Sequence, residues 1–113
     1  MVQTRSQFKV QWNNKILILP IIERFTEFDS LKYVFSDPNT PSFNIIFYLP
    51  SVVIDAMKTQ RVVLKMPIVG QITEGAEASQ LIATFVSSQK NKWQMTINDK
   101  NDVNVQATGF ICI

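Results

Sequence analysis

Polar and apolar side chains alternate strictly over residues 7–12, and this period of two predicts a half-buried β-strand. Asn13-Asn14 follows, and asparagine tolerates the left-handed backbone conformation that tight hairpin turns require. Residues 15–19 read Lys-Ile-Leu-Ile-Leu and predict a second, more buried strand that ends at Pro20. The pattern therefore predicts a β-hairpin over residues 7–19.

The segment 21–35 fits two kinds of secondary structure. Its larger apolar residues fall on one side of a helical wheel, as in an amphipathic helix. Residues 31–35 also alternate, however, and are rich in strand-forming types. We expect a helix or an irregular crossing in the first half and a strand in the second. The residues on the helical wheel are Ile21, Phe25, Phe28, Leu31 and Phe35.

Two prolines and two turn residues predict a loop over residues 37–41, because proline cannot continue a β-ladder. Phe43–Leu49 is predicted as a strand that stops at Pro50. Ser51 is suited to cap a short helix that runs to Lys58. That helix would place three apolar side chains on one face, namely Val53, Ile54 and Met57.

Residues 61–69 predict another strand, in which Pro67 indicates an edge position or a bulge. The small and polar residues 70–79 predict a loop. Residues 81–88 are expected to form the next strand, although a helix is an open alternative. The side chains that would form the helical face are Ala78, Leu81, Ile82, Phe85 and Val86.

The remaining sequence predicts a β-meander. Residues 93–97 alternate cleanly, and residues 103–113 place every second side chain on one apolar face. Polar turns are expected at 89–91 and 98–102. The latter is rich in oxygen ligands, but Lys100 in its middle favours a hairpin turn over a calcium site.

The number and spacing of these elements predict a mainly β fold. We expect an antiparallel β-sandwich or a jelly-roll-like barrel of seven to eight strands. The alternative is an α+β fold with one or two helices packed on an antiparallel sheet. Residues 1–6 are predicted to form a flexible arm, and residues 7–113 to form a single domain.

The composition indicates where in the cell the protein is expected to be. The chain has 113 residues, a net charge of +2 and one cysteine, so no disulfide can form within it. It has no Asn-x-Ser/Thr sequence and no signal-peptide pattern, and its apolar runs are much shorter than the ~20 residues of a membrane span. We therefore expect a cytoplasmic or otherwise intracellular protein that is not secreted.

The sequence contains no histidine, which removes the usual general base and the commonest metal ligand. Cys112 has no cationic neighbour in sequence and is expected to be a small buried side chain. Glu23 and Glu27 would share a helix face and could serve acid–base catalysis, but a solvated helix face explains them equally well and is far more common. We predict no enzyme activity and no catalytic, cofactor-binding or metal-binding residues.

Two sets of lysines beside tryptophans are candidates for contact with single-stranded nucleic acid or a small ligand. The competing interpretation is that the tryptophans lie in the core while the lysines protect sheet edges. The small net charge favours the second interpretation. The candidate contact residues are Lys9, Trp12 and Lys15 in one set, and Lys90, Lys92 and Trp93 in the other.

The end of the sequence is apolar, and Phe110, Ile111 and Ile113 are candidates for an interface with a neighbouring chain. We therefore expect a non-catalytic structural or protein-interaction module that forms homo-oligomers or binds a protein partner. A nucleic-acid or small-ligand binding β-module is the alternative. The asparagine- and isoleucine-rich composition and the apolar β core are similar in style to those of small viral structural proteins.

Overall fold

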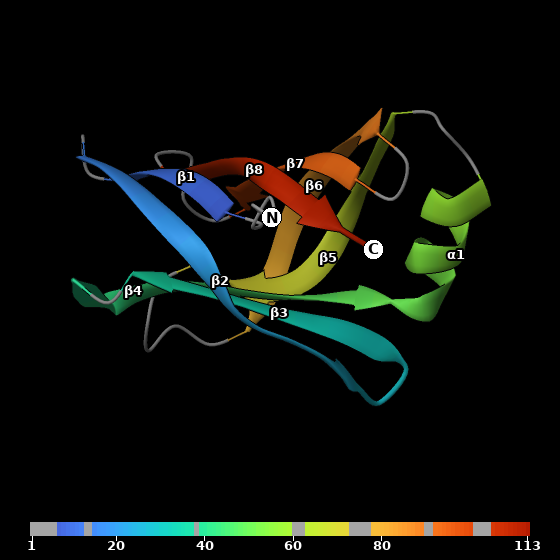
Figure 1. The fold of residues 1–113 in the computed structure, drawn as a ribbon, viewed down its shortest axis with the longest axis horizontal. Coiled ribbons are helices and arrows are strands. Elements are labelled where there is room, and N and C mark those ends of the chain that lie inside the picture. Colours follow the sequence, from blue (N-terminus) through green and yellow to red (C-terminus); the bar gives the residue numbers. More distant parts are fainter. Residues whose placement is uncertain are drawn as a thin grey trace, which may run out of the picture.

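The computed structural model describes residues 7–12, 15–37, 39–59, 63–72, 78–89, 92–100 and 105–113. Over these ranges the chain forms eight strands and one short helix (Figure 1). The elements are β1 (Gln7–Trp12), β2 (Lys15–Glu27), β3 (Ser30–Asp37), β4 (Thr40–Pro50), α1 (Ser51–Thr59), β5 (Leu64–Gln71), β6 (Ser79–Gln89), β7 (Lys92–Asp99) and β8 (Gln106–Cys112).

The strands close into an antiparallel barrel. Each strand pairs with its neighbours in the sequence, and β1 also pairs with β8, where Gln7 lies opposite Phe110. The predicted mainly β fold with seven to eight strands is confirmed. The strand order, which the hydrophobic pattern left open, is an uninterrupted meander.

The barrel is flattened into two layers that share strand β2 (Figure 1). The amino-terminal half of β2, Lys15–Pro20, pairs with β1, whereas its carboxyl-terminal half, from Ile21 onward, pairs with β3. The ladder is irregular between Ile21 and Glu23, directly after Pro20, so β2 changes layer at a proline and a bulge, as strands at barrel corners do.

We call the two layers the large and the small layer. The large layer consists of the amino-terminal half of β2 with β1, β8, β7, β6 and β5. The small layer consists of the carboxyl-terminal half of β2 with β3 and β4. Strand β5 joins the layers at the other side, because its last residues, Val69–Gln71, pair with β4.

The interior between the layers is filled by apolar side chains. Four rings form its centre: Phe8 meets Phe35 edge-on with ring centroids 4.6 Å apart, and Tyr33 stacks on Phe47 at 5.0 Å. Each fully buried side chain of this size contributes about 1.5–3 kcal/mol to folding. Phe43, Phe85, Trp93 and Leu19 are also among the largest buried side chains.

Two glycines lie at joints between paired strands. A Cβ atom on Gly109 would collide with the backbone oxygen of Gln7 and lie 2.8 Å from the Cα atom of Phe8, across the β1–β8 seam. A Cβ atom on Gly70 would collide with the backbone oxygen of Ile46, where β5 meets β4. The close approach of the strands at both joints therefore depends on glycine.

The predicted helix or irregular crossing after Ile21 is wrong, because β2 continues to Glu27 and a two-residue turn leads into β3. The apolar residues on the helical wheel do not share one face: Phe35 is buried in the core, whereas Phe25 is 41% exposed and Phe28 is 92% exposed. Phe28 has a φ of 55°, a strained value for a bulky side chain. The turn is anchored by the Ser51 N–H, which donates to the Asp29 carbonyl oxygen at 2.8 Å.

The helix after Ser51 is confirmed as α1, with Ile54 and Met57 buried and Val53 packed against the core. The predicted loop over residues 37–41 is shorter than expected, since β3 reaches Asp37 and β4 begins at Thr40. The Asp37 carboxylate accepts a hydrogen bond from the Asn39 N–H at 2.9 Å, which closes this tight turn.

In the second half of the chain, the strand predicted over 81–88 is confirmed within β6 and its helical alternative is excluded. Buried and exposed residues alternate along β7 and β8 as predicted. The predicted loop over 70–79 begins later, because β5 extends to Gln71. The predicted arm at 1–6 and the turn residues 13–14, 90–91 and 101–102 lie outside the described residues.

Candidate interaction surfaces

The apolar carboxyl-terminal strand, β8, contributes more side chains to the core than to the exposed surface. Ile111 is fully buried and Ile113 is partly buried against the core, which leaves Phe110, 39% exposed, as the accessible member of the predicted interface. Strand β8 pairs with β1 on one side and β7 on the other. Both of its edges are therefore occupied over Gln106–Phe110, and these residues offer no free ladder to a neighbouring sheet.

The predicted contact residues that the structure describes also divide into one buried residue and two that face outward. Trp93 is 2% exposed and belongs to the core, so its ring is not available to a ligand. Lys92 faces outward, and its Nζ atom lies 4.8 Å from the centroid of the Phe110 ring. Lys9 is exposed on β1, while the side chains of Trp12, Lys15 and Lys90 lie outside the described part of the structure.

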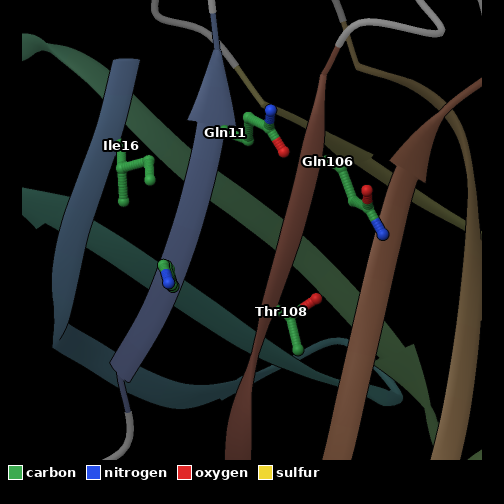
Figure 2. A pocket seen from close by; sticks show the side chains of 5 residues that line it. Gln11, Ile16, Gln106 and Thr108 are labelled. Atoms are coloured by element: carbon green, nitrogen blue, oxygen red, sulfur yellow. The ribbon is translucent and has the colours of Figure 1, made fainter. Parts of the chain in front are cut away.

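Lys9 borders a shallow hollow on the outer face of the large layer. The hollow has a volume of about 240 Å³ and lies across β2, β1 and β8 (Figure 2). Apart from Lys9 and Ile16, its lining is amide and hydroxyl, which gives it hydrogen-bonding groups and one cation. Its lining residues are Lys9, Gln11, Ile16, Gln106 and Thr108.

The amino-terminal half of β2 carries an apolar surface that the sequence did not reveal. Ile16 is 62% exposed and Ile18 is 47% exposed, so the predicted "more buried" strand is wrong for these two positions. The reason is that Leu17 and Leu19 face the core and the isoleucines therefore point outward. The run of four apolar residues, 16–19, was the signal in the sequence. A strand with one buried face needs an apolar side chain only at every second position, so two of the four had to face outward.

This half of β2 is also unpaired along one edge. Residues 15–20 pair with β1, but β3 pairs with β2 only from Ile21 onward. Among the residues that the structure describes, no strand lies against the other side of Lys15–Leu19. An exposed strand edge with apolar side chains is a template for pairing with another chain.

Two other edges, which have no partner strand among the described residues, carry the features that normally prevent such pairing. The carboxyl-terminal half of β2 carries Glu23, Arg24 and Glu27. The part of β5 that β4 does not reach contains Lys65 and Pro67, both exposed. The edge position predicted for Pro67 is thus confirmed. Between Ile16 and Leu19 the chain has neither a charge nor a proline.

The outer face of the large layer is electrostatically one-sided. We call it the lysine face, after its outward-facing cations Lys9, Lys65 and Lys92. Asp and Glu are absent from the outward-facing positions of its described strands, whereas β2, the β2–β3 turn and α1 hold Glu23, Glu27, Asp29 and Asp55. The other polar groups of the lysine face are uncharged: Gln7, Gln11, Gln80, Thr84, Gln94, Thr96, Asn98, Gln106 and Thr108.

A buried tyrosine connects the two layers. The Tyr33 hydroxyl donates to the Cys112 carbonyl oxygen at 3.0 Å and accepts from the Arg24 Nε–H at 3.2 Å. Burial raises the pKa of Tyr33 because the phenolate would lose its hydration, and this outweighs the opposing effect of Arg24. The side chain of Cys112 is exposed, so its predicted burial is wrong: position 112 faces outward, opposite in orientation to Ile111.

The predicted helical pairing of Glu23 and Glu27 is also wrong, since both residues lie on strand β2. Glu27 instead forms an ion pair with Lys32 on β3, with 3.5 Å between Oε2 and Nζ. Within the described ranges, no three His, Cys, Asp or Glu side chains come together as a metal site would require. Helix α1 is too short to cross a bilayer, and the described residues contain no longer apolar helix.

No family model, no curated protein and no solved structure matches this chain. The two surfaces that the structure offers to a partner are the β2 edge and the lysine face.

Proposed function

We propose that this protein is a non-catalytic interaction module that self-associates through the amino-terminal half of β2. The observation that carries the proposal is the unpaired edge of Lys15–Leu19, on which Ile16 and Ile18 are both exposed. Pairing with another strand would satisfy the free backbone groups and remove both isoleucines from water.

The sequence of this edge favours a second copy of the chain as the partner. Ile16-Leu17-Ile18 reads the same in both directions. An antiparallel pairing centred on Leu17 would place Ile16 of one copy opposite Ile18 of the other, twice, around a two-fold axis. Such an isologous contact uses one surface patch on both subunits and closes at the dimer.

The expected affinity is modest. Half-burying an isoleucine contributes about 1 kcal/mol, and four of them contribute about 4 kcal/mol per dimer. Backbone pairing adds to this, while lost translational and rotational freedom opposes it by at least ~4 kcal/mol. The contact is short compared with stable interfaces. We therefore expect a dissociation constant in the micromolar range or weaker.

Light scattering after size-exclusion chromatography, with loading from about 1 µM to about 1 mM, tests this range of affinity. The wild-type chain should change from monomer to dimer as concentration rises. Ile18→Lys should remain monomeric throughout, because it places a charge in the middle of the edge.

Val86→Lys is the matched control. Val86 is 40% exposed on the same outer face, but it lies on β6, away from the β2 edge. This variant should dimerise like the wild type, and circular dichroism should show that both variants are folded. A wild type that stays monomeric at every concentration, or an unchanged dimer with Ile18→Lys, would contradict the proposal.

A further inference from the structure

We propose that the lysine face binds single-stranded nucleic acid, a function distinct from self-association. The face carries Lys9, Lys65 and Lys92 without a carboxylate among its described outward positions. The net charge of +2 does not reveal this arrangement. The acidic residues of β2, the β2–β3 turn and α1 offset the charge of these lysines in the total, but they do not lie on the lysine face. Charge complementarity therefore points to a polyanion.

The cations are arranged across the strands. Lys9 pairs with Thr108, which continues through Thr96 and Thr84 to Lys65, so one row crosses five strands. Four strand spacings of ~4.8 Å place the two lysines roughly 19 Å apart along the sheet. The row between them is made only of hydroxyl groups, which accept and donate hydrogen bonds without repelling a phosphate.

An aromatic ring lies beside this row. Phe110 is 39% exposed and occupies the neighbouring row, between Gln7 and Gln94. Lys92 lies over its ring at 4.8 Å, so a stacking surface and a cation occur together. Aromatic rings beside cations on an open sheet bind unstacked bases, which single strands present and duplexes do not. The amides Gln7 and Gln94 can bond to base edges.

The test is fluorescence anisotropy of the full chain with a labelled oligothymidylate, measured at several salt concentrations. Three phosphate contacts predict that the logarithm of the association constant falls with the logarithm of salt concentration with a slope of about −2. Lys9→Glu, Lys65→Glu and Lys92→Glu should each weaken binding roughly tenfold or more at low salt. Phe110→Ala should do the same by removing the stacked base, with little change in slope.

Lys58→Glu is the matched control, because Lys58 is an exposed lysine on α1, away from the lysine face, and its substitution should change binding less than about twofold. Absence of binding at low salt, or equal losses with Lys58→Glu, would overturn the proposal. So would equal binding of a duplex, or equal competition by polyglutamate, which would indicate an acidic protein surface instead.

Self-association is separable from this activity. Ile18→Lys should still bind the oligonucleotide even as a monomer, since Ile18 is at the margin of the face and its substitution adds a cation rather than removing one. Loss of binding in Ile18→Lys with retention in Lys9→Glu would show that the lysine face is not the site.

Discussion

The two halves of strand β2 each have one edge without a described partner, and they differ in the charge of their exposed side chains. The carboxyl-terminal half exposes Glu23 and Arg24, whereas the amino-terminal half exposes Ile16 and Ile18. Both halves belong to one continuous strand, so backbone geometry alone does not explain the difference. Charged edges discourage strand addition and apolar edges permit it. The barrel therefore protects one of these edges with charges and leaves the other able to pair.

The greatest loss of stability should come from disrupting the β1–β8 seam that closes the barrel. Gly109→Ala would place a methyl group against the Gln7 carbonyl, so β1 would have to move away from β8. We expect unfolding free energy to fall by about 3 kcal/mol, the upper end of the usual cost of overpacking. Urea denaturation followed by tryptophan fluorescence measures this.

Thr108→Ala is the control for that substitution, because Thr108 is the next residue but faces outward. Its effect should lie within about 0.5 kcal/mol, as for most surface changes. If Gly109→Ala proved as stable as Thr108→Ala, the close approach at the seam would not constrain the barrel.

Reducing the charge of the carboxyl-terminal half of β2 should have a smaller effect, on assembly rather than on stability. The double substitution Glu23→Val with Thr26→Val leaves the Arg24–Tyr33 hydrogen bond in place and replaces one charged and one polar side chain of this edge with apolar ones. A chain whose second edge is less protected should form some species larger than dimers at concentrations where the wild type forms dimers only. Analytical ultracentrifugation would reveal them, and a distribution identical to the wild type would show that the charges do not protect the edge.

The smallest effect concerns the hydrogen bond that ties the layers together. Tyr33→Phe removes the donor to the Cys112 carbonyl, which should cost about 1 kcal/mol of stability near neutral pH. The raised pKa of Tyr33 adds a pH dependence: the stability that the neutral phenol supplies is complete below its ordinary pKa of 10.0 and is lost as pH rises through the higher pKa of the folded state.

The phenylalanine variant has no such group to ionise. The stability difference between wild type and Tyr33→Phe, measured by urea denaturation, should therefore shrink as pH rises above about 10. A constant difference across that range would mean that Tyr33 is not the group whose ionisation destabilises the barrel.

Much of the fold was accessible from the sequence. Alternation identified β1, β7 and β8, and the serine cap together with its apolar face identified α1. The wheel over residues 21–35 failed because Phe25 and Phe28 are apolar without being buried, and periodicity cannot distinguish an exposed phenylalanine from a core one. The prediction that the second strand ends at Pro20 was also wrong. Pro20 lies where β2 passes from one layer to the other, and a proline is compatible with a strand at such a position.

The candidate surfaces were less accessible, because each depends on contacts between distant segments. The sequence places Lys9 and Lys92 beside tryptophans, but only the register sets Lys92 against Phe110 and aligns Lys9 with Lys65. The free edge at Lys15–Leu19 depends on where β3 stops, which local patterns do not specify. Trp93 was ambiguous in the sequence and the structure assigns it to the core.

The β1–β8 seam also bears on the order in which the barrel can form. Every other strand pairing joins neighbours in the sequence, whereas this one joins Gln7 to Phe110. Contacts between such distant residues have a large loop-closure entropy and are typical of domains that fold in milliseconds to seconds rather than microseconds. Until the seam closes, β1 and β8 each keep an edge open that the finished barrel conceals.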